Sequence, residues 1–240
     1  MFHPSALLRA AAVAALALLG SCNNDSGSSG TVSGPVRHFF VIVLENKGYS
    51  TTFESSPAPS SYLAQTLPSM GVLLRQYYGT GHASLDNYIT MISGQPPNAL
   101  TQADCPLFVN VTPGTLDPLE QNAIYIGQGC VFPASTQTIV DELEALGFSW
   151  KGYMQDLDDG TTHTCRHPAL NSQDTTENAT AANQYATRHN PFMYFHSIID
   201  QQARCDAHVV DLAVLNQDLQ SAATTPNYTF ITPDLCADGH

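Results

Sequence analysis

Residues 37–44 read RHFFVIVL, a continuous run of apolar and β-branched residues that leads directly into the polar sequence ENKG at residues 45–48. Such a run is typical of a strand that is buried on both faces of a parallel sheet. Further strands are expected at residues 72–78, 148–154 and 228–232. The chain is therefore expected to build a sheet from strands that are well separated in the sequence.

Segments with helical periodicity lie between these strands. Residues 84–93 and 136–146 place their apolar side chains on one face, and shorter or weaker helical patterns lie at residues 62–67 and 209–222. Strands that alternate with helices predict an α/β fold with a mostly parallel central sheet and helices on both faces. Residues 95–134, which are rich in Pro, Gly and Asn, are expected to form a long surface insertion.

The first 35 residues are not expected to belong to the fold. Residues 1–22 resemble a signal segment that ends in Leu-Gly-Ser-Cys, where Cys22 would carry a lipid anchor, and residues 23–35 form a Ser- and Gly-rich linker. Ordinary signal cleavage with an incidental Cys22 is the alternative. The sequence thus predicts export, a membrane contact only through this anchor, and a folded domain at residues 36–240.

Composition limits the classes of partner. The chain has 240 residues, of which 43% are hydrophobic, which is enough for one domain with a sizeable core. Asp and Glu number 21 against 8 Lys and Arg, for a net charge of −13. Nucleic acid is excluded as a partner because its phosphates demand clustered basic residues. A bound phosphate would need a metal ion, a helix N-terminus or a few placed side chains.

The cysteines predict a disulfide framework. None of the five that follow Cys22 forms a CxxC pair, so a zinc knuckle is not expected, and an exported chain reaches an oxidising compartment. Proximity in the sequence favours two pairs and leaves Cys236 without a partner. The expected pairs are Cys105–Cys130 and Cys165–Cys205.

Polar residues that follow the predicted strands are candidate site residues, because parallel sheets bind ligands at the carboxyl ends of their strands. Ser84 opens a predicted helix, where its hydroxyl suits an alkoxide nucleophile or an incoming phosphate, although the local sequence by itself favours a structural N-cap. Glu45 and Asn46 offer oxygen ligands for a hard metal or form a simple turn. The same two possibilities, metal ligands or a turn, apply to Asp234, Asp238 and His240.

Three blocks in this order resemble a known family. They are VIVLEN at residues 41–46, GHASLDNY at residues 81–88 and PNYTFITPDLCADGH at residues 226–240. Together they are similar to the phosphoesterase family of bacterial acid phosphatases and phospholipases C, within the alkaline-phosphatase-like superfamily. The resemblance covers residues 36–240 and implies an alkaline-phosphatase-like sheet and a place in the bacterial cell envelope.

The resemblance also implies roles for individual residues. Glu45 and Asn46 match the first metal-binding pair of the family. Ser84, which lies ten residues before Gly94, matches the nucleophile of the wider superfamily, and Asn87 matches the residue that helps to hold the phosphoryl group.

Further positions in the matching blocks imply contacts with the substrate or the metal. His82 is a candidate substrate contact, and so is His189, which lies in the sequence RHNP at residues 188–191 that also resembles a block of the family. His189 could instead belong to a turn before an apolar run. His240 is expected at the phosphate site, and Asp238 is expected to be a metal ligand.

The implied activity is hydrolysis of phosphate monoesters, dependent on a divalent metal ion, through a phosphoserine intermediate on Ser84. The alternatives are a phospholipase C-type phosphodiesterase acting on a phospholipid head group, and a non-catalytic surface lipoprotein that keeps the fold as a binding module. Family members continue past the block at residues 226–240 into a further strand and more metal ligands. The resemblance therefore predicts a fold that is incomplete at its C-terminus and a chain of low activity.

Overall fold

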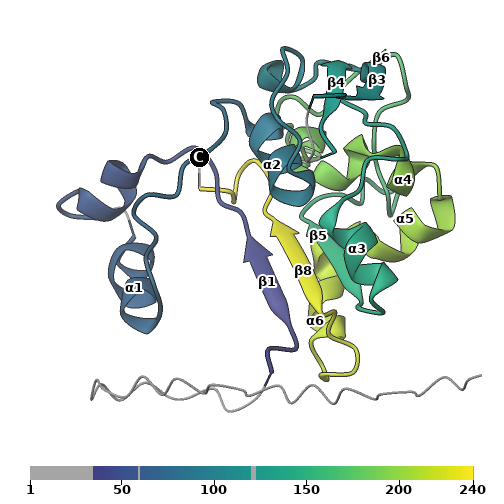
Figure 1. The fold of residues 1–240 in the computed structure, drawn as a ribbon. Coiled ribbons are helices and arrows are strands. Elements are labelled where there is room, and N and C mark those ends of the chain that lie inside the picture. Colours follow the sequence, from purple (N-terminus) through teal and green to yellow (C-terminus); the bar gives the residue numbers. More distant parts are fainter. Residues whose placement is uncertain (1–34, 59, 120–122, 240) are drawn as a thin grey trace, which may run out of the picture. The chain divides into compact units, whose positions relative to one another are not determined.

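The central sheet is parallel throughout. The computed structural model describes residues 35–58, 60–119 and 123–239. The sheet has the strand order β1-β8-β5-β7, and β1, β8 and β5 run side by side in the same direction (Figure 1). Its strands are β1 (Phe39–Ile42), β8 (Tyr228–Thr232), β5 (Trp150–Met154) and β7 (Val209–Asp211). The predicted α/β class and the parallel sheet are confirmed.

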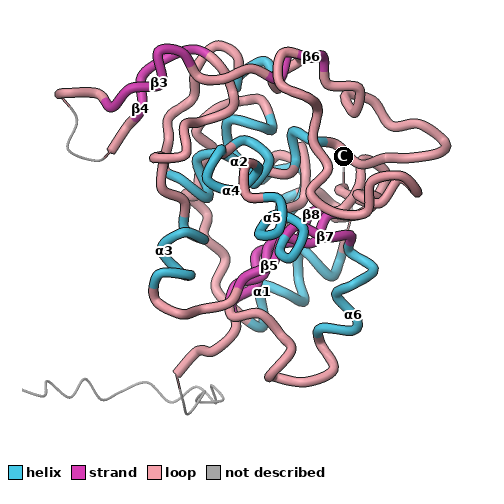
Figure 2. The backbone as a smooth tube through the Cα atoms, turned by 90° about the vertical axis from the view of Figure 1, so that its right-hand side faces the viewer, coloured by secondary structure: helices cyan, strands magenta, loops and turns pink. Residues whose placement is uncertain are grey.

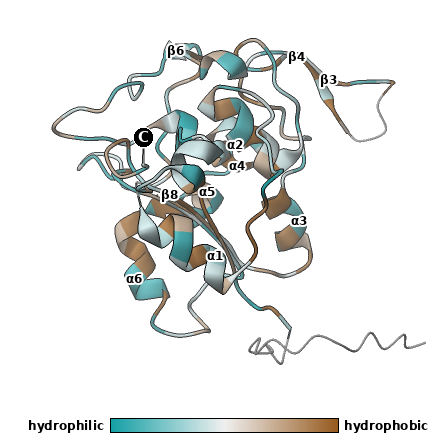
Figure 3. Ribbon diagram, turned by 90° about the vertical axis from the view of Figure 1, so that its left-hand side faces the viewer, coloured by the Kyte–Doolittle hydropathy of each residue, from teal (hydrophilic) through white to brown (hydrophobic). Residues whose placement is uncertain are grey.

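Helices cover both faces of this sheet. Trp150 and Phe230 belong to the larger core, on the face where the long helices pack, whereas Ile231 belongs to a small cluster with Leu215 on the other face. Figure 3 shows brown, hydrophobic segments along the strands between these layers. The helices are α1 (Leu67–Met70), α2 (Ser84–Ser93), α3 (Ile139–Ala145), α4 (His196–Ile199), α5 (Gln202–His208) and α6 (Leu215–Asp218).

Two small antiparallel pairs complete the set of strands. The pairs are β2 (Leu107–Phe108) with β6 (Ser172–Gln173), and β3 (Thr112–Leu116) with β4 (Tyr125–Gln128). Figure 2 shows β5, β7 and β8 close together, with long loops above them. Among the described residues, no helix combines the length and the apolar character that crossing a bilayer requires.

Local signals explain the helices that were predicted correctly. Helix α2 has the predicted bounds and ends at Gly94, which adopts the left-handed conformation that glycine tolerates best. Helix α3 begins after Thr138, whose side chain forms a capping box with Asp141. The helical pattern at residues 62–67 becomes a π-helical turn (Tyr62–Thr66) followed by α1.

The predicted burial of the first strand is wrong. β1 occupies the expected place, but it lies at an edge of the described sheet, and Phe39 and Ile42 are 57% and 63% exposed. The strand predicted at residues 72–78 is absent from the described structure, because no neighbouring strand pairs with that segment. A strand needs a partner for its backbone groups, and local apolar character cannot supply one.

Two further expectations fail for related reasons. The helix predicted at residues 209–222 begins instead as strand β7, because the β-branched Val209 and Val210 pair with β5. The segment 95–134, expected on the surface, contributes side chains to the core, among them Phe108 and Phe132, which are fully buried. The Cys105–Cys130 disulfide closes a loop within this segment, and hydrophobic packing holds the segment against the domain.

The predicted disulfides are confirmed. Cys105 bonds to Cys130, and Cys165 bonds to Cys205, with Cα atoms 6.1 Å and 5.3 Å apart. Cys236 is exposed and unpaired among the described residues. The predictions for residues 1–34, including the lipid anchor at Cys22, lie outside the described residues.

Candidate active site

A cleft of about 940 Å³ opens where β1 and the start of α2 meet. One wall is the loop that follows β1, and another is the glycine-containing loop at residues 79–83 that leads into α2. Asp104 and the pair Arg188 and His189 close the cleft from other parts of the chain. The cleft therefore lies at the carboxyl end of the sheet, where parallel α/β folds place their ligands.

Ser84 is the first residue of α2 and is not its cap. The N-cap position belongs to Ala83, and no side chain of the cap residue bonds to the helix. The Ser84 hydroxyl instead donates to Glu45 Oε2 at 3.2 Å, and its Oγ lies 3.1 Å from His189 Nε2. The hydroxyl thus faces the cleft between a carboxylate and an imidazole, both of which can accept a proton.

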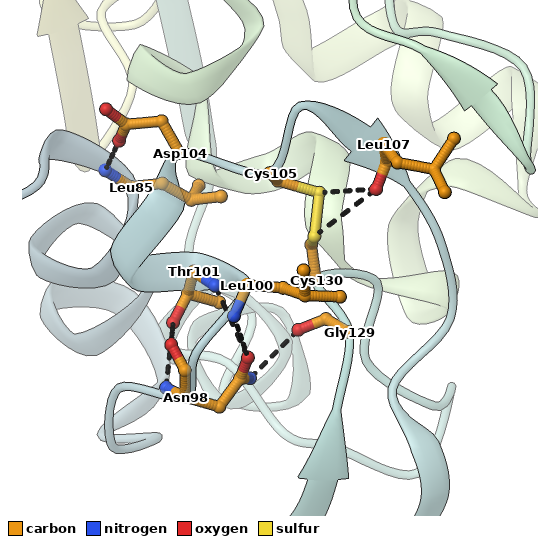
Figure 4. The surroundings of a disulfide bond; sticks show 9 residues. All are labelled: Leu85, Asn98, Leu100, Thr101, Asp104, Cys105, Leu107, Gly129 and Cys130. Carbon is orange, nitrogen blue, oxygen red and sulfur yellow. Dashed lines mark hydrogen bonds between the residues drawn. A yellow bond between two sulfur atoms is a disulfide. The ribbon is translucent and has the colours of Figure 1, made fainter.

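Asp104 supplies the cap that Ser84 does not. Its Oδ1 accepts a hydrogen bond from the backbone N–H of Leu85 at 2.9 Å (Figure 4). Asp104 adopts a left-handed conformation with φ of 58° and directly precedes Cys105, which the disulfide ties to Cys130. The disulfide therefore helps to fix the residue that caps the helix, and the Ser84 hydroxyl remains available for chemistry.

His189 is held deeply in the site by contacts on several sides. Its side chain is 3% exposed, with Nε2 3.5 Å from Glu45 Oε1 and Nδ1 4.0 Å from Asp238 Oδ2. Its backbone carbonyl accepts a hydrogen bond from Thr232 Oγ1 of β8 at 3.1 Å. Two carboxylates therefore flank the imidazole, one near each ring nitrogen.

Glu45 and Asn46 come directly after β1. The backbone N–H of Glu45 donates to the carbonyl of Asp238 at 2.7 Å, which ties this loop to the segment after β8. Asn46 adopts a left-handed conformation with φ of 49°, which asparagine tolerates better than most residues, and it lines the cleft. The end of β1 and the backbone hydrogen bond between Glu45 and Asp238 thus place both residues at the cleft.

Asn87 holds the loop in front of α2. Its Oδ1 accepts from the Thr80 N–H at 2.7 Å, and its Nδ2 donates to the carbonyl of Ala83 at 2.7 Å. A Cβ at Gly79 would come within 2.6 Å of Asn87 Oδ1, and one at Gly81 would overlap the Asp86 carboxylate, so the loop needs glycine at both positions. The contact between Asn87 and a phosphoryl oxygen remains a prediction.

The oxygen donors of the cleft fit a hard divalent cation in their chemistry. Oxygens that share one such ion each lie roughly 2–2.5 Å from it, and the 3.2 Å between Glu45 Oε2 and Ser84 Oγ suits that arrangement. Within the described part of the chain, no cluster of three or more His, Cys, Asp or Glu side chains is arranged to hold a metal. A cation would therefore also need the hydroxyl of Ser84 and the amide oxygen of Asn46.

Most of the predicted site residues line one cleft. Glu45, Asn46, His82, Ser84, Asn87 and His189 all do so. Asp238 is fully buried and approaches the site through His189, whereas His240 lies outside the described residues.

Sequence reasoning missed Asp104, Tyr88 and Arg188, each of which also lines the cleft. Tyr88 lies four residues after Ser84 and therefore on the same face of the helix, a signal that was available in the sequence. Burial and, next, the Glu45 carboxylate raise the pKa of Tyr88 well above its ordinary value, so its hydroxyl keeps its proton.

Comparison with known proteins gives one family and several relatives. The profile of the phosphoesterase family matches residues 52–240, more than half of the chain. A probable acid phosphatase of Kluyveromyces lactis is 24% identical over 204 residues, which cover 85% of this chain. A phosphate-repressible acid phosphatase of Penicillium chrysogenum and an acid phosphatase of Aspergillus fumigatus are each 25% identical over 202 residues, which cover 84% of this chain.

The aligned region is a minor part of these relatives. It spans 39% of the first two proteins and 36% of the third. No solved structure matches the chain.

Proposed function

The chain belongs to the phosphoesterase family, and from this premise we propose that it hydrolyses phosphate monoesters, with Ser84 as the nucleophile. The observation that carries the proposal is the position of the Ser84 hydroxyl, which lies between Glu45 and His189 at the N-terminus of α2. The acid phosphatase names of the relatives support a monoester as the substrate.

The proposed first step forms a phosphoserine. Ser84 Oγ attacks phosphorus while the bond from phosphorus to the ester oxygen breaks, and the alcohol leaves with a proton. The Ser84 proton passes to His189 Nε2 or to Glu45, since both lie within reach of the hydroxyl, and from there to the oxygen of the leaving alcohol. In the second step, water attacks the phosphoserine from the opposite side, which releases phosphate and restores the serine.

The start of α2 contributes to binding the phosphoryl group. The N-terminus of a helix attracts anions through its unpaired N–H groups and its dipole. We propose that Glu45 and Asn46, with Ser84 and Asp238, hold a divalent cation, which when bound supplies positive charge for the phosphoryl oxygens. His82 and His189 line the same cleft and complete the proposed substrate contacts.

Replacing the nucleophile tests the proposal. In the 240-residue chain, Ser84→Ala is expected to lower turnover of an aryl phosphate monoester by about 10³-fold or more, because no other group can form the covalent bond. Ser93→Ala is the matched control, since Ser93 lies at the far end of the same helix and bonds only within it and to the following turn. Mass spectrometry after an acid quench is expected to find phosphate on the peptide that carries Ser84.

Other outcomes of this experiment would favour a different function. Full turnover by Ser84→Ala would overturn the proposal. Turnover of an aryl phosphodiester with none of the monoester would instead indicate a phospholipase C-type activity. Binding of a phosphate ester that is unchanged in Ser84→Ala, with no turnover by either protein, would indicate the binding module.

Export and anchoring complete the proposal. The two disulfides are consistent with an oxidising compartment. We propose that the protein is held at the bacterial cell envelope by a lipid on Cys22, as the preceding Leu-Gly-Ser sequence indicates. Incorporation of labelled palmitate into the wild-type protein and its loss in Cys22→Ser would support the anchor, and equal labelling of both would refute it.

A further inference from the structure

Tyr88 lies one helical turn beyond Ser84 on α2. Residues separated by four positions share a face of a helix, so Tyr88 lies beside the Ser84 hydroxyl and lines the same cleft. Its side chain is 1% exposed. Nothing in the proposed chemistry requires a tyrosine at this position, yet its surroundings are unusually specific.

The ring of Tyr88 is stacked on the imidazole of His189. The two rings are nearly parallel, with an angle of 7° between their planes and 5.3 Å between their centroids. On another side, the edge of Phe230 from β8 meets the Tyr88 ring at a centroid distance of 6.2 Å. Tyr88 is therefore fixed by the sheet and in turn limits how the His189 ring can turn.

The hydroxyl of Tyr88 is buried near the Glu45 carboxylate but makes no hydrogen bond within the described part of the chain. Burial and, next, the charge of Glu45 raise the pKa of Tyr88. The ring, which is stacked on His189, is therefore the part of Tyr88 that contacts a group around the Ser84 hydroxyl.

We infer that Tyr88 is a positioning residue whose stacked ring holds the His189 imidazole against Ser84. The inference rests on the proposed function, because it assigns a purpose to this geometry in the attack by Ser84. Reacting groups must be held closely, and a displacement of about 1 Å can lower a rate by about 10²-fold. Two substitutions separate the effect of the ring from that of the hydroxyl.

Tyr88→Phe keeps the stacked ring and removes only the hydroxyl. It is expected to change kcat for an aryl phosphate by about twofold or less, because the hydroxyl makes no hydrogen bond among the described residues. Tyr88→Leu removes the stacked ring and is expected to lower kcat by about 10²-fold with little change in KM, since the loss acts on the reacting groups and not on substrate binding. Tyr153→Leu is the matched control, because Tyr153 is also a buried tyrosine and lies in the cluster on the other face of the sheet. It is expected to leave kcat unchanged.

A second readout does not depend on turnover. In protein labelled at its histidines, the ring resonance of His189, assigned with His189→Asn, is expected to be shifted by the stacked ring of Tyr88. The shift should persist in Tyr88→Phe and disappear in Tyr88→Leu. Inactivity of the wild-type protein with this pattern intact would count against the proposed function and still support the positional role of the ring.

Two results would overturn the inference. One is a His189 resonance that is the same in wild type and Tyr88→Leu, which would show that the ring does not hold the imidazole. The other is an active wild-type protein whose kcat is unchanged by Tyr88→Leu. A loss in Tyr88→Leu that is matched by Tyr153→Leu would likewise refute it, since a general effect of removing a buried tyrosine would then explain both.

Discussion

Residues 35–83 and residues 84–239 bury their side chains very differently, although both contain long apolar runs. No described side chain of the first region is buried, whereas the second region holds the hydrophobic core and both disulfides. Neighbouring strands explain the contrast: β8 has a partner on each side and buries all five of its residues, whereas β1 has a partner on one side among the described strands. Burial thus depends on neighbours as well as on composition.

The candidate active site joins these two regions. Ser84, Tyr88 and His189 come from the well-packed region, and Glu45 and Asn46 come from the exposed one. The contacts of Glu45 with Ser84 and with His189 therefore join the exposed region to the well-packed region. Substitutions in the two regions are expected to change the free energy of unfolding by different amounts, and they are given from the largest effect to the smallest.

The largest effect is expected in the core. Phe230→Ala should lower the free energy of unfolding by about 3–5 kcal/mol, because it leaves a cavity beside Phe192 and Tyr88 where the side chain is fully buried. Phe40→Ala, in the exposed region, should lower it by about 1 kcal/mol or less. Urea denaturation measures both, and equal losses would show that the two regions are packed alike.

The same contrast separates the elements that could be predicted from the sequence from those that could not. The helix at residues 84–93 and the strand at residues 228–232 were predictable because periodicity, a terminal glycine and β-branched runs are local signals. The exposure of β1 was not, since it depends on strands elsewhere in the chain. The strand predicted at residues 72–78 failed for the same reason: its apolar residues have no partner to pair with.

The site divides in the same way. Ser84 and Glu45 could be proposed because they follow predicted strands and lie in blocks that resemble the family. The role of Asp104 could not, since it caps α2 from nineteen residues away and depends on a local left-handed conformation. Residues such as Asp104, which reach the site from a distant part of the chain, can be found only when the fold is known.

The next effect concerns a disulfide of the well-packed region. The Cys165–Cys205 bond closes a loop with a sequence separation of 40 residues, so replacing both cysteines with alanine should lower the free energy of unfolding by about 3 kcal/mol. Cys236→Ala is the matched control and should change it by about 0.5 kcal/mol or less, because Cys236 is exposed and unpaired. A stable double variant would show that the core alone holds residues 157–205 in place.

A smaller effect is expected where Asp218 meets β5. Lys151 Nζ and the Tyr153 hydroxyl each lie 2.6 Å from Asp218 Oδ2. Burial alone would raise the pKa of Asp218, but these two hydrogen bonds outweigh it and lower the pKa below its ordinary value. Ionised Asp218 therefore stabilises the fold above its unfolded pKa of about 4, and this contribution is lost as the pH falls through the lower folded value.

Substitution at this pair tests the direction of the shift. Asp218→Asn should lower the free energy of unfolding by about 1.5 kcal/mol at pH 7, and the difference from wild type should shrink below about pH 4. Asp200→Asn is the control, since Asp200 is 61% exposed and its pairing with His196 is expected to contribute about 0.5 kcal/mol or less. A difference for Asp218→Asn that grows as the pH falls would contradict the assigned direction.

The smallest effect is expected on the exposed edge, where the comparison can be made within one row of the sheet. Ile42 of β1 and Ile231 of β8 are register partners, yet Ile42 is 63% exposed and Ile231 is 8% exposed. Thr keeps the β-branched shape that strands favour and adds a hydroxyl, so Ile42→Thr should change the free energy of unfolding by about 0.5 kcal/mol or less. Ile231→Thr should lower it by about 2 kcal/mol, because its hydroxyl would be placed among Tyr153 and Val210 without water. Urea midpoints of the two variants give the difference directly. If Ile42→Thr proved as destabilising as Ile231→Thr, the edge strand would be covered in solution, and the contrast between the two regions would no longer hold.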